Sequence, residues 1–253
     1  MKDNIKKEII ALKRKEEAFL KKERTEIALK EVIYEKVPEK LIGTLELAFT
    51  KAFKLVFLQG TGLIEKTFKK EDLDLEFEAN DFILHKKTSK KAIKRMDKIS
   101  GKSNLLNNSF ATVSGFGMGL LGMGIPDIPV LVSIILKGVY QIALSYGFDY
   151  NNENEKIYIL RLIRVALTAG EDRLKYNDEL ESMDYEGVTV DQEITKTAKV
   201  LSDELLVEKF VQGMFIVGII GGFVNHSVYK KISKLASIKY KKRYLFMKLL
   251  DNN

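Results

Sequence analysis

The sequence predicts an all-α protein: a helical bundle in which two glycine-rich apolar helical segments pack at the centre. Three observations support this fold class. Only 3 of the 253 residues are prolines, which favours long helices over a β fold with many turns. Apolar residues recur at intervals of three and four along several segments, as they do on one face of a helix. The hydrophobic content of 45% allows a sizeable core.

The composition restricts the chemistry open to this chain. It has no cysteine, which excludes disulfides, thiolate nucleophiles and cysteine-ligated zinc, and which fits a reducing cytoplasm. The net charge of +7 favours an anionic partner such as phosphate, nucleic acid or acidic lipid. A solvated basic surface with no specific partner explains the same charge equally well.

Residues 1–37 form the first unit of the predicted organisation, and residues 38–253 form the second. The first unit is predicted to be one charged amphipathic helix over 2–36, with glutamate and lysine interleaved on its polar faces. Pro38 ends it, because proline disfavours helical geometry in the preceding residue. The apolar core of a signal peptide is not visible in this stretch. The apolar stripe of the helix consists of Ile5, Ile9, Leu12, Phe19, Ile27 and Val32.

Three segments lead from this helix to the most apolar part of the chain. A second helix is predicted over 39–68, with glycines near its end where it should break. Residues 71–81 are acidic; alternating apolar residues hint at a short strand there, but we interpret the segment as an acidic linker. Residues 86–102 reverse the sign of the charge and predict a basic helix.

Two uncharged stretches, Ser103 to Pro126 and Phe210 to Tyr229, are rich in glycine. Glycine inside a helix costs about 1 kcal/mol relative to alanine, so several of them call for compensation by close packing. Glycines spaced four apart lie on one helix face and let two backbones approach each other. We therefore expect the two stretches to pack together, with a turn at Asp127 at one end. The glycines with this spacing are Gly115 and Gly119, and Gly218 and Gly222.

Membrane insertion is the alternative interpretation of these stretches. About 20 apolar residues are enough for a helix to cross a bilayer. The first stretch, however, begins with asparagines, and Pro126, Asp127 and Pro129 separate it from the next apolar block. A buried core helix or a hairpin that dips into the membrane therefore fits the lengths better than a full span.

The chain between the two stretches carries signals of helix ends. One helix is predicted to end at Gly147, in a C-cap position. Asn152 or Asn154 then caps another helix, which runs to about Ala169. Residues 170–192 are polar and acidic and contain glycines that favour turns, so they predict a loop or mobile insertion.

The usual catalytic motifs are missing. The pattern G-x-G-x-x-G occurs at Gly117, but without the preceding strand that a dinucleotide site needs. His85 and His226 lack the spacing of zinc ligands, so no metal site and no cofactor is predicted. Asp127 and Asp149, beside turns, form the alternative: a metal- or anion-dependent hydrolase-like site. Aspartates in such positions more often cap helices.

Three runs of residues resemble the EcsC family: G-F-G-M-G-L-L-G-M-G-I-P-D-I-P, Y-Q-I-A-L-S-Y-G-F-D and E-K-I-Y-I-L-R-L-I. A glycine-rich helix, an asparagine and a basic helix ending near an arginine resemble a second family element, although the proline that commonly opens it is missing. The resemblance covers about residues 39–248. It implies a bacterial protein whose name is linked to an ABC transporter operon, and it brings no defined reaction and no catalytic residues. The residues that match the family motifs are Gly115, Gly117, Gly119, Gly122, Gly124, Pro126, Asp127, Pro129, Tyr146, Gly147, Asp149, Gly218, Gly222, Asn225 and Arg243.

We therefore expect a non-enzymatic accessory protein that associates with the cytoplasmic face of a membrane or with a transporter. Its partner would be an anionic membrane surface or a membrane protein, since basic helices beside apolar stretches attract acidic headgroups. A nucleic-acid partner is disfavoured, because no known reading motif is present and half of each basic helix is apolar. The residues expected to contact anionic lipid are Lys230, Lys231, Lys234, Lys241, Lys242 and Arg243.

Overall fold

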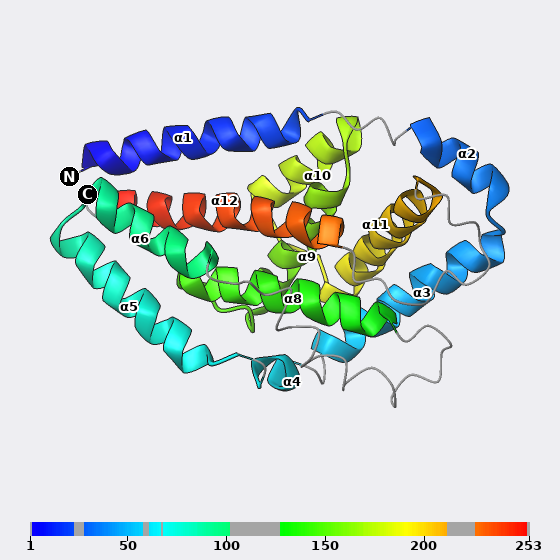
Figure 1. The fold of residues 1–253 in the computed structure, drawn as a ribbon, viewed down its shortest axis with the longest axis horizontal. Coiled ribbons are helices and arrows are strands. Elements are labelled where there is room, and N and C mark those ends of the chain that lie inside the picture. The colour runs from blue at the N-terminus through cyan, green and yellow to red at the C-terminus, as the bar shows by residue number, and fades with distance from the viewer. Residues whose placement is uncertain are drawn as a thin grey trace.

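A computed structural model describes residues 2–22, 28–57, 61–66, 68–101, 127–211 and 226–251, and all regular secondary structure in these ranges is helical. This confirms the all-α prediction (Figure 1). The packing expected between the two glycine-rich stretches falls outside the described residues. The helices are α1 (Lys2–Leu20), α2 (Ala28–Lys36), α3 (Glu39–Leu55), α4 (Thr61–Glu65), α5 (Lys70–Lys86), α6 (Lys90–Gly101), α8 (Asp127–Ser145), α9 (Glu153–Leu167), α10 (Gly170–Ser182), α11 (Val190–Val211) and α12 (His226–Leu250).

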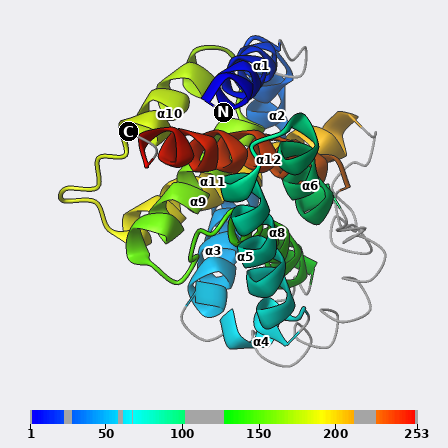
Figure 2. The ribbon, with the colours of Figure 1, turned by 90° about the vertical axis from the view of Figure 1, so that its left-hand side faces the viewer.

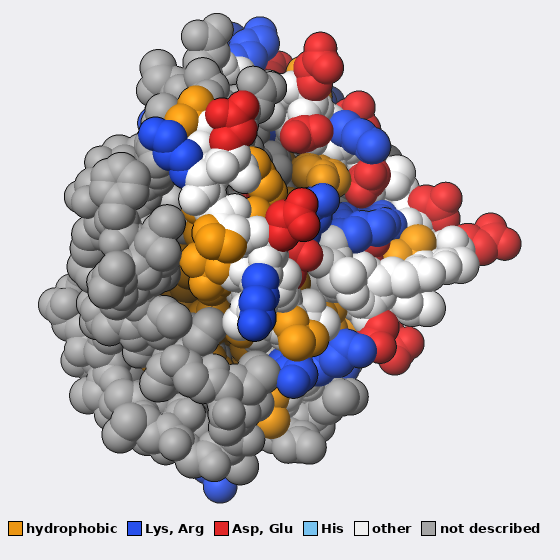
Figure 3. Space-filling view, turned by 90° about the vertical axis from the view of Figure 1, so that its right-hand side faces the viewer, with side chains coloured by type: hydrophobic (Ala, Val, Ile, Leu, Met, Phe, Trp, Pro, Cys, Tyr) orange, Lys and Arg blue, Asp and Glu red, His pale blue; other side chains and the backbone are white. Residues whose placement is uncertain are grey.

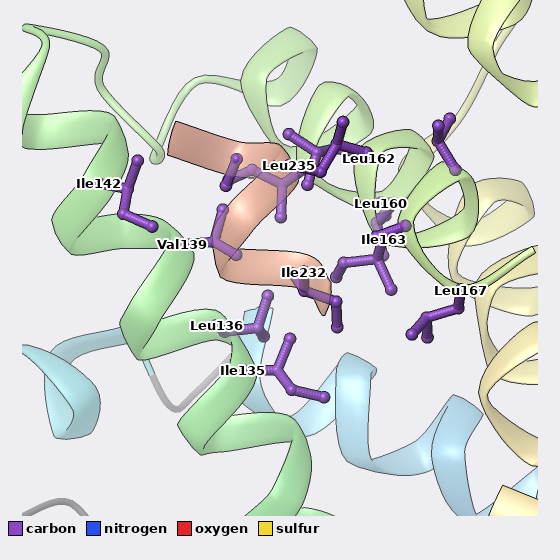
Figure 4. Packing of buried hydrophobic residues seen from close by; sticks show 14 of the residues in the cluster. Ile135, Leu136, Val139, Ile142, Leu160, Leu162, Ile163, Leu167, Ile232 and Leu235 are labelled. Atoms are coloured by element: carbon purple, nitrogen blue, oxygen red, sulfur yellow. The ribbon is translucent and has the colours of Figure 1, made fainter. Parts of the chain in front are cut away.

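Helix α9 lies at the centre of the fold. Its residues from Ile157 to Leu167 are all buried. It packs against α10, α11 and α12, while α8 packs against α12 and α3. Aliphatic side chains of α8, α9 and α12 meet in the core, among them Val139, Ile163 and Leu235 (Figure 4).

The N-terminal segment forms two helices, so the prediction of one helix over 2–36 is wrong. Helix α1 ends at Leu20 because Arg173 of α10 binds its C-terminal end. The buried guanidinium donates hydrogen bonds to the carbonyl oxygens of Phe19 (2.8 Å) and Lys22 (2.9 Å) and also lies over the Phe19 ring. A cation at the last carbonyls of a helix satisfies acceptors that have no partner within the helix. The division into units 1–37 and 38–253 stays a prediction.

Two segments predicted as non-helical are helices. The acidic segment 71–81 lies within α5, whose first turn carries Glu71 and Asp72, where negative charge is favourable at a helix N-terminus. Leu73 and Phe77 pack against the core from one face of this helix, whereas Leu75 between them is exposed; in a strand all three would lie on the same face. The prediction of a linker there is therefore wrong.

The predicted insertion at 170–192 is also mostly helical. Helix α10 spans Gly170–Ser182, with acidic residues in its first turn and Leu180 fully buried. Helix α11 begins at Val190, which leaves only 183–189 outside helices. The polar composition reflects the exposed face of α10, which the sequence pattern did not separate from a loop.

The predicted helix ends around 147–152 are confirmed. Gly147 has φ of 77°, the left-handed conformation typical of a residue just after a helix. The Asn152 side chain accepts a hydrogen bond from the backbone N–H of Asn154 at 2.9 Å and so caps α9. Helix α8 begins at Asp127, and Pro129 lies in its first turn, where a missing N–H costs nothing.

Within the described ranges, one helix is long and apolar enough to cross a membrane. This is α8 from Ile128 to Ser145, and 89% of that stretch is buried inside the protein. Its apolar composition is therefore explained by its place in the core, where it contacts α3, α5 and α12. Whether the two uncharged stretches enter a membrane stays a prediction, because most of their residues lie outside the described ranges.

Candidate functional site

Phe148, Glu155 and Tyr158, which lie within the runs that resemble the family, meet around Arg243 of α12. The guanidinium of Arg243 forms a two-pronged ion pair with Glu155 of α9: Nη1 lies 2.8 Å from Oε1, and Nη2 lies 3.0 Å from Oε2. Both side chains are largely buried, with 14% and 9% of their surface exposed. A buried cation is tolerated here because its carboxylate partner satisfies it in bidentate geometry.

Aromatic rings enclose the same guanidinium. Its central carbon lies 4.2 Å from the ring centre of Phe148, 3.9 Å from that of Tyr158 and 5.4 Å from that of Tyr240. The hydroxyl of Tyr240 donates to Glu155 at 2.6 Å. Cations bind to the faces of aromatic rings, and more strongly when water is excluded. These residues form what we call the Arg243 cluster: Phe148, Glu155, Tyr158, Tyr240 and Arg243.

The electrostatics of the Arg243 cluster favour fixed charges over proton transfer. Burial alone would lower the pKa of Arg243, but its hydrogen bonds to Glu155 outweigh burial and the pKa is raised. Burial raises the pKa of Tyr240 well above its ordinary value, and the neighbouring Glu155 raises it further. Burial likewise raises the pKa of Tyr158. The groups therefore hold their charge states at neutral pH, as a structural cluster does.

The motif Tyr146-Gly147-Phe148-Asp149 places its residues against α5, α6 and α12. Tyr146 packs beside Tyr244 of α12 with ring centres 6.2 Å apart. A side chain at Gly147 would overlap the ring of Phe77 from α5. Phe148 packs on Tyr240 and on the guanidinium of Arg243. The motif thus joins the end of α8 to α12 and has a structural role in the described part of the chain.

The basic C-terminal half of α12 faces inward, against the expectation of lipid contact. Lys241 pairs with Glu8 of α1 at 2.6 Å and with Asp97 of α6 at 2.8 Å. Lys242 pairs with Glu16 at 2.6 Å, and only 9% of its side chain is exposed. Lys241, Lys242 and Arg243 form ion pairs with carboxylates of other helices, so these three side chains are largely buried in this fold.

The N-terminal half of α12 differs from the C-terminal half. Lys231 pairs with Glu204 of α11 at 2.6 Å and is mostly covered. Lys230 and Lys234 are exposed. Of the six residues expected to contact lipid, only these two remain accessible for that role.

The exposed cations of α6 form a second candidate site. Lys90, Lys91, Lys94 and Arg95 are exposed and line a hollow of about 610 Å³. Among the described residues none of the four has an ion-pair partner. The next carboxylate along the helix, Asp97, lies beside Lys241 and accepts a 3.4 Å hydrogen bond from Tyr146. We call these four residues the α6 basic face.

Helix α6 packs against α5 and α8, and it begins at the end of the molecule where the chain termini lie (Figure 1 and Figure 2). The end of the molecule beside α2 and α11 looks different. There the described surface mixes basic, acidic and apolar side chains (Figure 3).

The two aspartates proposed for a hydrolase-like site are separated by helix α8. Asp127 is the first residue of this 19-residue helix, and Asp149 follows its last turn. A helix of that length spans about 28 Å, since each residue rises by about 1.5 Å. Asp149 is exposed and accepts a hydrogen bond from the backbone N–H of Asn151 at 3.0 Å. The two carboxylates therefore do not form one catalytic site.

Metal chemistry finds no support in the described ranges, where no group of His, Asp and Glu side chains has the arrangement of a metal site. His85 lies near the end of α5 and is exposed. The other predicted motif residues fall outside the described side chains, so the structure does not place them. They are Gly115, Gly117, Gly119, Gly122, Gly124, Pro126, Asp127, Gly218, Gly222, Asn225 and His226.

Sequence reasoning missed the acidic partners of the buried cations. The sequence analysis singled out neither Glu155 nor Glu16, yet both are buried beneath cations of α12. For Glu16 the sequence did carry a signal. Its spacing of four from Leu12 and three to Phe19 places it in the apolar stripe of α1. A carboxylate in such a stripe indicates a buried cation on the facing helix.

Comparison with known proteins agrees with this architecture. The model of the EcsC protein family matches residues 3–245. The chain is 24% identical over 207 residues to Protein EcsC of Bacillus subtilis (strain 168), which covers 81% of this chain and 79% of that protein. It is also 24% identical over 164 residues to the uncharacterized protein YdbA of the same organism, covering 62% of this chain and 60% of that protein. No solved structure matches the chain. Because the family model covers nearly the whole chain, this chain belongs to the EcsC protein family.

Proposed function

We propose that this protein is a non-enzymatic accessory protein that attaches to the anionic cytoplasmic face of a membrane through the α6 basic face. The observation that carries the proposal is that Lys90, Lys91, Lys94 and Arg95 are exposed and have no ion-pair partner among the described residues, whereas Lys241, Lys242 and Arg243 of α12 are covered and paired. Cations left in solvent on one helix face are available to an anionic surface.

The size of the electrostatic attraction supports reversible attachment. A lysine or arginine near an anionic bilayer contributes about 1 kcal/mol, so the four residues of the α6 basic face contribute about 4 kcal/mol together. That energy corresponds to about a thousandfold in the binding constant. The attraction falls off within about 8–10 Å at physiological salt, so it requires the helix to lie at the surface.

The sequence on either side of the described helices supports the same orientation. The uncharged stretch from Ser103 to Pro126 directly follows α6, and the stretch from Phe210 to Tyr229 leads into α12. Lys230 and Lys234, the accessible cations of α12, come just after the second stretch. Apolar sequence beside exposed cations is the pattern of surface-bound membrane proteins.

Vesicle flotation tests the proposal. The test variant changes all four residues of the α6 basic face to glutamate. Two of these substitutions lie in the first turn of α6, where glutamate favours the helix, so loss of the helix is not expected. The control variant changes the same kinds of residue on other exposed surfaces to glutamate, with an equal change of net charge: Arg14, Lys15, Lys21 and Lys175.

The proposal expects wild type and the control variant to float with anionic vesicles at low salt, and the α6 variant to stay in the soluble fraction. Equal flotation of both variants would contradict the α6 basic face as the contact. Binding to native membranes but not to protein-free anionic vesicles would replace the lipid surface with a membrane-protein partner. An accessory role beside a transporter would then be the better proposal.

A further inference from the structure

We propose that helix α10 is a releasable cover over a cationic groove between α9 and α12, and that an acidic helix of a partner protein takes its place there. The inference concerns a different surface from the α6 basic face and does not rest on the proposed membrane attachment. It goes beyond that function by naming a protein partner of stated chemistry.

Helix α10 buries little apolar surface against the core. Over its whole length, which the structure describes, Leu180 is the only apolar side chain that is buried, and Tyr176 is partly buried. Helix α9, against which α10 packs, buries every residue from Ile157 to Leu167. Burial of apolar surface is the main force that holds the elements of a fold together, so the attachment of α10 depends on its polar contacts.

Cations of two other helices hold α10 through its carboxylates. Glu179 lies 3.3 Å from a guanidinium of α9, and a second guanidinium of α9 donates to its backbone carbonyl oxygen at 2.8 Å. Glu181 lies 2.5 and 3.1 Å from two ammonium groups of α12. All four cations are buried. We call them the groove cations: Arg161, Arg164, Lys239 and Lys242.

The groove cations keep carboxylate partners on fixed helices when α10 leaves. Glu193 of α11 pairs with Arg164 and lies 3.6 Å from Arg161. Glu16 of α1 pairs with both lysines and lies 2.6 Å from Lys242. Release of α10 therefore leaves none of these ions without a counter-charge, which would be prohibitive for a buried group. Four cations and two remaining carboxylates give the open groove an excess of positive charge, which the carboxylates of α10 balance in the closed state.

The contacts of Arg164 show that α10 does not use the full capacity of the groove for an anion. This side chain is fully buried, yet its Nε and Nη1 atoms have no hydrogen-bond partner among the described residues. Glu179 and Glu193 both bind Nη2. Arg243, by contrast, is held by two parallel hydrogen bonds to Glu155. Buried donors without acceptors are costly, so a carboxylate that binds Arg164 in the two-pronged manner is favoured over Glu179.

The chain at both ends of α10 allows the helix to move away. Gly170, its first residue, has φ of 58°, and Gly187 in the loop that follows has φ of 68°. No atom beyond the neighbouring residues lies within 4 Å of a Cβ atom placed at either position. Hinges are a few residues at the ends of elements that absorb changes of φ and ψ. Because α10 lies at the periphery of the molecule (Figure 2), it can swing out with residues 183–189 while α9 and α11 stay packed.

The chemistry of α10 identifies the partner. Toward the groove it presents Leu180 between the carboxylates of Glu179 and Glu181. A helix of another protein with a leucine between acidic residues fits the same cations. Because α10 is tethered beside the groove at high effective concentration, this partner must bind more tightly than α10 does. The free donors of Arg164 offer the additional hydrogen bonds.

Hydrogen–deuterium exchange of the full-length protein tests the release of α10. The test variant is Glu179→Gln with Glu181→Gln, which removes both charges that the groove holds. The control variant, Asp178→Asn with Glu186→Gln, removes the same charge from exposed positions of α10 and its loop.

We expect the amides of α10 to exchange about tenfold faster in the test variant than in wild type or the control variant, with α9 and α11 unchanged. In wild type, about 1 M salt should accelerate exchange in α10 alone, because its carboxylates are partly exposed and are screened. Exchange of α10, α9 and α11 in step under all these conditions would show that α10 opens only when the whole protein unfolds, and would overturn the inference.

A fluorescent peptide with the sequence of residues 170–182 is the probe for the partner helix, and the same peptide with Glu179→Gln and Glu181→Gln is its control. The test variant should bind the first peptide about tenfold more tightly than wild type does, because its own α10 no longer competes, and it should not prefer the control peptide. Equal binding of the two peptides to the opened variant would refute an acidic helix as the occupant. A gain in binding to phosphatidylglycerol vesicles in place of the peptide would replace the partner helix with lipid and also contradict the proposal. Flotation of the α6 variant remains a separate test, since none of these outcomes depends on α6.

Discussion

Substitution of Gly147 by alanine tests the account of the family motif. Gly147 has φ of 77°, and a Cβ atom there would overlap the ring of Phe77. The left-handed conformation costs a non-glycine residue about 1–2 kcal/mol. Phe77 must also move, which disturbs its edge-on contact with Tyr244 at 6.0 Å between ring centres. Such a contact is worth about 0.5–1.5 kcal/mol, so the whole cost is about 2–3 kcal/mol.

The same chain offers a control for backbone strain alone. Gly187 also has positive φ, 68°, but nothing lies within 4 Å of a Cβ atom placed there. Gly187→Ala should therefore cost only the conformational part, about 1–2 kcal/mol. In a double-mutant cycle, Gly147→Ala in a Phe77→Ala background should destabilise the protein only by the conformational part, about 1–2 kcal/mol, because the ring that the new Cβ would overlap is gone.

Thermal unfolding monitored by circular dichroism measures these differences. For a chain of this size each kcal/mol lowers Tm by about 2–4 °C, so Gly147→Ala should lower Tm by about 4–12 °C. Gly187→Ala should lower it by less. If the two variants melt at the same temperature, the close approach of Phe77 to the Gly147 backbone is not part of the folded protein, and the explanation of this motif is wrong.

Three further predictions concern contacts away from the motif. Arg173→Met should free the C-terminal end of α1, because the carbonyls of Phe19 and Lys22 lose their buried donor. Limited trypsin digestion should then cleave faster after Lys21, and an unchanged rate would contradict the capping role. Burial alone would raise the pKa of Glu181, but the ion pairs with Lys239 and Lys242 outweigh burial and lower it. The stability that Glu181 contributes is therefore fully present above its unfolded pKa of about 4.3 and lost as the pH falls through the lower pKa of the folded state. Glu181→Gln should reduce the drop in Tm between about pH 5 and pH 2, and an unaltered drop would refute the assignment. Gly138→Ala would place a Cβ atom 2.6 Å from the Tyr229 ring, so it should destabilise by about 1 kcal/mol as the ring moves, and a rise in Tm would show that α8 and α12 do not approach closely there.

The helical class was predictable because it depends on local spacing. The stripe at Ile5, Ile9 and Leu12 identified α1, and Gly147 and Asn152 marked helix ends through their own backbone chemistry. These signals lie within a few residues of each other. The family resemblance came from the same regions, because the motif residues join the end of α8 to its neighbours.

The interior of the bundle could not be predicted in the same way. Whether Lys242 faces solvent or the core depends on Glu16, which lies 226 residues earlier and on another helix. A basic segment is predicted to lie at the surface when the carboxylates that pair with it lie on helices far away in the sequence. The same holds for α10, whose polar sequence resembled a loop although Arg173 and Leu180 anchor it in the core.

The α6 basic face could be predicted only in part from the sequence. The basic helix over 86–102 was predicted from its charge, but lipid contact was assigned to α12. Carboxylates of α1, α6, α9 and α10 pair with cations in the C-terminal half of α12, whereas Lys90 and Lys91 have no partner among the described carboxylates, so we propose α6 as the contact.

A probe at a single engineered cysteine tests the central claim most directly, since the chain has no native cysteine. We would attach an environment-sensitive fluorophore at Lys87→Cys, beside the start of α6, or at Lys175→Cys on α10; both positions are exposed. On addition of anionic vesicles, the account predicts a blue shift and protection from aqueous quencher for the probe beside α6, with no change for the probe on α10. A response confined to α10, or an equal response at both positions, would contradict attachment through the α6 basic face.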